Sequence, residues 1–102
     1  MPHLLIPQGR ACRYWSRKDE DAFFLWLQSI PGVTRVKGVG TQLIVSLRSK
    51  RLSDRALRDL IGLHMRYGLP MRSLARFETP QNRLWFRSKQ MYWYRKVFGR
   101  AL

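Results

Sequence analysis

The sequence predicts a small α+β fold, and three observations lead to that prediction. Two segments carry apolar residues at helical spacing, and each begins with a serine followed by acidic residues, a combination typical of helix N-termini. Between them, residues 33 to 47 alternate in polarity with a period of two, which is typical of β-strands. Prolines and glycines separate these segments and mark where each one ends.

The length and composition predict one globular domain. A chain of 102 residues is long enough to bury one core. Its 45% hydrophobic and 13% aromatic content excludes a disordered chain. We divide the domain into an irregular N-terminal arm at residues 1–9, a folded body, and a basic, aromatic C-terminal extension at residues 79–102.

The first strand and the first helix are expected just after the arm. Residues 10–15 are assigned to the strand, because prolines and Gly9 interrupt any pattern before them. Ser16 then predicts a helix N-cap, and the helix must end before Pro31. One apolar face of this helix has the spacing i, i+3, i+4, i+7 and consists of Phe23, Trp26, Leu27 and Ile30.

Two further strands are expected to form an antiparallel hairpin. The first runs from residue 33 to residue 39, and the second follows the turn at Gly40-Thr41. In the second strand, Leu43, Val45 and Leu47 fall on one side, which predicts that this side faces the core.

The second helix is expected between Ser53, as its N-cap, and Gly68, as its terminating glycine. Its apolar stripe consists of Leu57, Leu60, Ile61 and His64. A last strand is predicted over residues 71–77, a turn over residues 79–82, and a final short helix from Ser88 as cap, over residues 89–98, to Gly99.

The order of these elements is strand, helix, strand, strand, helix, strand. That order predicts a ferredoxin-like sandwich (βαββαβ), in which an antiparallel sheet carries both helices on one face. The short C-terminal basic and aromatic helix is added to this arrangement.

The sequence contains no pattern of a catalytic or metal site. Cys12 is the only cysteine, so there is no intrachain disulfide and no CxxC pair, and the two histidines, His3 and His64, have no partners at ligand spacing. His64 and Cys12 are interpreted as core residues, and every acidic residue except Glu78 has a place at a helix terminus or in a helical ion pair, such as Arg55 with Asp59. We therefore expect no enzyme activity, no metal and no cofactor.

The charge balance is the main functional signal. Twenty lysines and arginines stand against six acidic residues, giving a net charge of +14, and Glu78 is the only acid after Asp59. Such an excess opposes compaction and indicates a polyanionic partner. The predicted binding residues are Arg48, Lys50, Arg51, Arg72, Arg76, Arg83, Trp85, Phe86, Arg87, Lys89, Tyr92, Arg95, Lys96 and Arg100.

These residues are expected to meet on one surface. If the last strand lay beside the first, Arg72 and Arg76 would join the other cations in a continuous positive face. The aromatic residues of the extension and their aliphatic neighbours divide into two groups by helical spacing. Met91, Trp93, Tyr94, Val97 and Phe98 are expected mainly in the core, and Trp85, Phe86 and Tyr92 in the contact surface.

Three functions agree with these features. The first is a non-catalytic module that binds RNA or single-stranded nucleic acid through cations and aromatic anchors. The second is a protein inhibitor, such as a toxin-neutralising immunity protein, that covers an acidic partner protein. The third is peripheral binding to an anionic membrane. A cytoplasmic location is expected from the single cysteine and the lack of a long apolar stretch, which also argues against integral membrane association.

Overall fold

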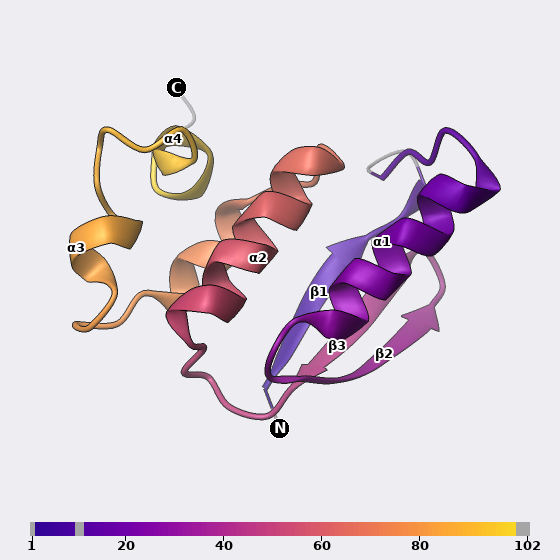
Figure 1. Ribbon diagram of the computed structural model, residues 1–102, viewed down its shortest axis with the longest axis horizontal. Helices are drawn as coiled ribbons and strands as arrows, with labels where there is room; N and C mark the ends of the chain where they lie inside the picture. The colour runs from indigo at the N-terminus through magenta and orange to yellow at the C-terminus, as the bar shows by residue number, and fades with distance from the viewer. Residues whose placement is uncertain (1, 10–11, 100–102) are drawn as a thin grey trace.

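The structure is a computed structural model that describes residues 2–9 and 12–99. Two long helices pack beside a small sheet, and shorter helical segments follow them (Figure 1). In chain order the elements are β1 (His3–Pro7), α1 (Arg17–Ser29), β2 (Val33–Val39), β3 (Gln42–Leu47), α2 (Asp54–Arg66), the 3-10 helix η2 (Arg72–Phe77), α3 (Arg83–Phe86) and α4 (Tyr94–Val97).

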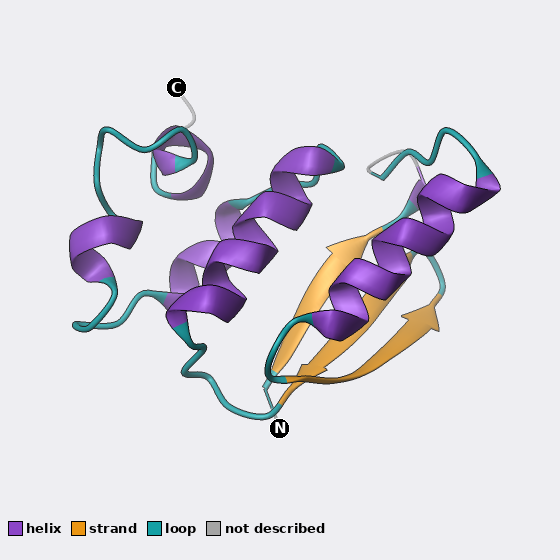
Figure 2. Ribbon diagram, in the orientation of Figure 1, coloured by secondary structure: helices purple, strands orange, loops and turns teal. Residues whose placement is uncertain are grey.

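The described strands form one antiparallel sheet in the order β1-β3-β2, with α1 lying across one face (Figure 2). The predicted hairpin is confirmed. Its connection begins at Gly40 with a φ of 58°, a value that suits the first position of a type II′ turn and that few residues other than glycine adopt. Leu43, Val45 and Leu47 are all buried, as their alternation predicted.

The first strand lies earlier than predicted. β1 occupies His3–Pro7, within the segment expected to be an irregular arm, while residues 12–15 form no strand and residues 10 and 11 lie outside the described part of the chain. Leu4 and Ile6 are fully buried between exposed neighbours, so the segment has the period of a strand despite its prolines. Pro7 is tolerated because it ends a strand at the edge of the sheet.

Both long helices begin where the sequence predicts. The hydroxyl of Ser16 accepts a hydrogen bond from the backbone N–H of Asp19, and Ser53 caps α2 in the same way through Ala56. Beyond the end of α2, Gly68 adopts a φ of 67°, and the N–H of Leu69 returns to the carbonyl of His64. The buried faces of these helices belong to one hydrophobic cluster that extends from β1 to α4.

The predicted last strand is wrong, because η2 occupies residues 72–77. Met71, Leu74 and Phe77 are buried and recur every third residue, which matches the three residues per turn of a 3-10 helix. The described strands therefore form a βαββ arrangement followed by helices, and the complete ferredoxin-like order is not formed. As a result, β1 is an edge strand of the sheet.

The final helix is also shorter than predicted. Residues 79–99, here called the C-terminal unit, contain two single-turn helices, and Ser88 caps neither of them. Asn82 holds the start of this unit: its side-chain amide donates to the carbonyl of Phe77 at 2.9 Å and its oxygen accepts from the N–H of Thr79 at 2.8 Å. α3 and α4 lie on the side of α2 away from the sheet (Figure 1).

Candidate functional site

The face of the sheet opposite to the core is largely exposed, and we call it the open face. Its side chains alternate with the buried ones along each strand, and cross-strand pairing places them in three rows. The rows are His3–Ser46–Arg35, Leu5–Ile44–Lys37 and Pro7–Gln42–Val39.

Charge and apolar surface occupy different ends of the open face. Arg35 and His3 share the row farthest from the Gly40 turn, and Lys37 lies in the middle row. Leu5 and Val39, each about half exposed, lie nearer the turn. None of the three strands contains an acidic residue, so Arg35 and Lys37 have no carboxylate neighbour in the sheet.

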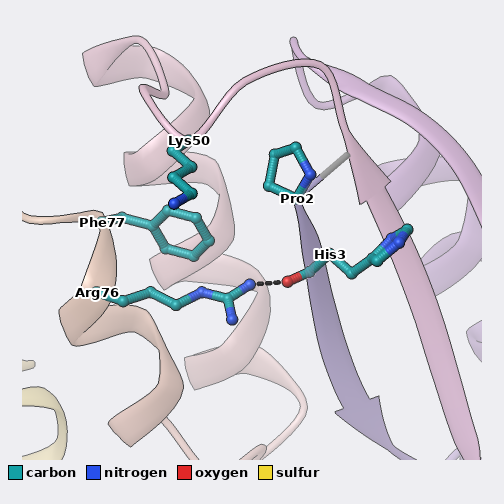
Figure 3. A pocket seen from close by; sticks show the side chains of 5 residues that line it. All are labelled: Pro2, His3, Lys50, Arg76 and Phe77. Carbon is teal, nitrogen blue, oxygen red and sulfur yellow. Dashed lines mark hydrogen bonds between the residues drawn. The ribbon is translucent and has the colours of Figure 1, made fainter.

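A cavity of about 330 Å³ lies beside the cationic end of the open face (Figure 3). It is lined by Pro2 and His3 at the start of β1, Lys50 from the β3–α2 loop, and Arg76 and Phe77 from η2. It therefore contains two of the predicted binding residues, which are 26 positions apart in the chain (76 − 50).

Arg76 connects η2 to the free edge of β1. Pro2 and Gln8 direct their backbone groups toward β3 and the adjoining turn, so the carbonyl of His3 points away from the sheet. The Arg76 guanidinium donates a hydrogen bond to this carbonyl and lies 4.9 Å from the centre of the Phe77 ring (Figure 3). Arg76 thus takes the place that the N–H of a fourth strand would occupy.

Three other cations that were predicted as binding residues are exposed. Arg48 and Arg51 line a shallower cavity of about 150 Å³ in the β3–α2 loop, and the N–H of Arg48 donates to the carbonyl of Gly32 at 2.8 Å. Arg72 is exposed at the start of η2. These residues add positive charge around the cavity of Figure 3 without lining it.

In the C-terminal unit, Glu78 pairs with two of the predicted binding residues. One of its oxygens lies 2.8 Å from Nε of Arg83 and 3.0 Å from Nε of Arg87. These hydrogen bonds, first that of Arg87, hold the pKa of Glu78 below its ordinary value. Glu78 therefore has a structural role, and the expectation that it had none is wrong.

Most aromatic rings of the C-terminal unit pack inside it. Phe86 is fully buried, so its ring lies in the core and not in a contact surface. Trp93 is buried as well and donates from Nε1 to the carbonyl of Phe86 at 2.8 Å. Trp85 is half-buried under the guanidinium of Arg58, 4.0 Å from the ring centre, and Tyr92 alone of the three predicted contact rings is largely exposed.

The strand that was to join the predicted cations into a continuous positive face is absent, because η2 occupies residues 72–77. Lys89, Arg95 and Lys96 are exposed, but they belong to the C-terminal unit, which α2 separates from the sheet (Figure 1). Arg100 lies outside the described residues. α4, which carries Arg95 and Lys96, contacts η2, which carries Arg72 and Arg76.

No group of three or more histidines, cysteines or acidic residues suitable for a metal ion occurs among the described residues. His64 is buried and its Nδ1 lies 2.7 Å from the carbonyl of Leu60, while burial lowers its pKa and keeps it neutral. This confirms the core interpretation of His64, and Cys12 is buried as well.

Two cations of the open face were not among the predicted binding residues. Arg35 and Lys37 belong to β2, where they were assigned only to the strand pattern. Their register against the buried Leu43, Val45 and Leu47 of β3 places them on the solvent side. The alternation of the hairpin therefore contained the signal that identifies them.

No known protein family, curated protein or solved structure matches this chain. In the described part of the chain, no helix has both the length and the apolar character needed to cross a membrane.

Proposed function

We propose that the protein is a non-catalytic module that binds RNA or single-stranded nucleic acid through the cationic end of the open face. The observation that carries this proposal is the convergence of Arg35, Lys37, Lys50 and Arg76 from three separate segments of the chain, none of them in an ion pair among the described residues. Unpaired cations on one surface can bind successive phosphates and release their counterions.

The shape of the surface favours a single strand. The open face spans three strands, roughly 10 Å across at about 4.8 Å between neighbours. The open face consists of strands, and α1 lies on the other face of the sheet (Figure 2), so α1 is not placed to enter a major groove from the open face. Leu5 and Ile44 next to the cations offer apolar surface to unpaired bases, which a duplex would not expose.

The proposal is tested by measuring the binding of fluorescent ten-nucleotide rU and dT strands by anisotropy, at 50 and 200 mM salt. We expect tight binding at low salt and a loss of one to several orders of magnitude at the higher concentration, because phosphate contacts depend strongly on salt. A duplex of equal length serves as the comparison and should bind more weakly. Absence of binding at low salt would refute the proposal.

An acidic partner protein is the second candidate, as for an immunity protein. It is favoured by the apolar end of the open face, where Leu5 and Val39 are each about half exposed. A protein interface would bury these side chains beneath a rim of charge pairs. Co-purification of one acidic protein at a fixed ratio, abolished by Leu5→Asp but retained after nuclease treatment, would favour this candidate over nucleic acid.

A further inference from the structure

We propose that the cavity between β1 and η2 binds a terminal phosphate of the nucleic-acid strand, so that the protein prefers phosphorylated strand ends. This inference rests on the proposed function and assigns one subsite within it. The cavity is lined by Pro2, His3, Lys50, Arg76 and Phe77, and it adjoins the row that contains Arg35 (Figure 3).

The cavity holds two positive charges that the protein does not neutralise. Lys50 and Arg76 both line it, and neither lies within 4 Å of a carboxylate among the described residues. Two like charges around one cavity repel each other, and a bound anion would relieve that repulsion. The hydrogen bond to the carbonyl of His3 uses one terminal nitrogen of Arg76, which leaves other guanidinium N–H groups as donors.

Counting charges favours a strand end over an internal phosphate. An internal phosphodiester carries one negative charge, whereas a terminal phosphate monoester carries about −1.5 to −2 at pH 7. Lys50 and Arg76 together supply two positive charges, so the monoester matches them more closely. A strand end can also enter a small cavity with one nucleotide, whereas an internal nucleotide could enter only if the strand passed in and out of the cavity.

The size and the walls of the cavity fit one nucleotide. Small-molecule sites in proteins begin at roughly 300 Å³ and combine apolar walls with a few polar groups. This cavity measures about 330 Å³ and places the Pro2 and Phe77 rings beside the two cations (Figure 3). The terminal sugar or base can rest on these rings while the phosphate contacts Lys50 and Arg76, and the remaining strand continues over Arg35 and Lys37.

The test compares ten-nucleotide dT strands that carry a 5′-phosphate, a 3′-phosphate or no terminal phosphate. Each phosphorylated strand has its fluorescent label at the other end and is compared with an unphosphorylated strand that has the label in the same place. With the full chain we expect one of the phosphorylated strands to bind roughly tenfold more tightly than the unphosphorylated one, the effect of one added charge-assisted contact. The two phosphorylated strands reveal which end enters the cavity.

Lys50→Gln should abolish this preference, and it should weaken binding of the unphosphorylated strand only by the amount expected for one lost phosphate contact. Arg48→Gln is the matched control, because it removes one charge from the same loop but does not line the cavity. Arg76→Lys keeps the charge while losing the planar fork, and it should reduce the preference without abolishing it. Thermal unfolding of each variant verifies that it is folded.

The outcomes separate the inference from the proposed function. Equal binding of all three strands, or a preference that survives Lys50→Gln, overturns the subsite and leaves the proposed function standing. If no strand binds at all, the proposed function fails. Inorganic phosphate at constant ionic strength should compete for this subsite only weakly; if it bound as tightly as the phosphorylated strand, the cavity would be a site for free phosphate and the assignment to a strand end would be overturned.

Discussion

Arg35 and Lys37 in the sheet and Arg83 and Arg87 in the C-terminal unit are all exposed cations, but their surroundings differ. The first two lie on strands without any acidic residue. The other two share the carboxylate of Glu78, and Arg87 also lies 4.4 Å from the centre of the Phe98 ring. The cations of the sheet are therefore free to bind an external anion, whereas this pair stabilises the fold around it.

The comparison shows that composition alone does not identify a binding surface. A segment rich in arginine and aromatic residues suggests a binding surface, yet in the C-terminal unit many of these residues bind each other. Arg87 lies over the ring of Phe98, and Trp93 donates to the carbonyl of Phe86. The sheet has fewer cations and no phenylalanine, tyrosine or tryptophan in its strands, and its cations have no carboxylate partner there.

The largest expected effect concerns the interior of the C-terminal unit. Phe86→Ala should reduce the free energy of unfolding by about 3–5 kcal/mol, because it leaves a cavity where a fully buried ring was packed against Phe98, at a ring distance of 4.9 Å. Urea unfolding followed by circular dichroism measures this change.

Tyr92→Ala is the matched control for that substitution, since Tyr92 is 61% exposed in the same unit. We expect it to alter the free energy of unfolding by less than about 0.5 kcal/mol. Similar losses in the two variants would show that the aromatic residues of this unit do not divide into buried and exposed groups as described.

The second effect concerns nucleic-acid binding. Replacing both Arg35 and Lys37 by Gln should weaken binding of a dT or rU strand on the order of tenfold at low salt, and should reduce the salt slope by roughly 1.4, or about 0.7 for each phosphate that the protein no longer neutralises. The control replaces Arg95 and Lys96, exposed cations of α4, and removes the same charge. Equal losses in both double variants would mean that only net charge matters.

Much of the fold could be predicted because local signals and packing agree in the central region. Ser16 and Ser53 cap helices where the sequence predicts, and the alternation of β3 identifies its buried side. The errors occurred at both ends. Leu4 and Ile6 form a strand because β3 pairs with them. Residues 72–77 adopt a 3-10 helix, and over so short a length its period of three is easily mistaken for the period of two of a strand.

The candidate site was only partly predictable, for a different reason. Lys50 and Arg76 were predicted as binding residues, but the cavity they share depends on η2 lying beside the edge of β1. A contact between distant segments leaves no periodicity in the sequence. Glu78 illustrates the same limit, because its pairing with Arg83 and Arg87 depends on the turn at Asn82.

The smallest expected effect tests the structural role of Glu78. Its pKa in the folded protein lies below the ordinary value of 4.5, so the unfolded chain takes up the proton more readily. The resulting stabilisation is fully present above about pH 5 and is lost as the pH falls through the folded pKa.

Glu78→Gln should therefore lower the free energy of unfolding at pH 7 by no more than about 1 kcal/mol, because both guanidinium partners are about half exposed and screened by solvent. The difference between the variant and the natural protein should shrink as the pH falls through the folded pKa of Glu78, because the carboxyl group is then protonated in both the folded and the unfolded state. Urea unfolding of both proteins at pH 7 and at a series of lower pH values measures it. A difference that stayed constant with pH would mean that the charge of Glu78 does not stabilise the C-terminal unit, and its arginines would then be as free to bind an anion as those of the sheet.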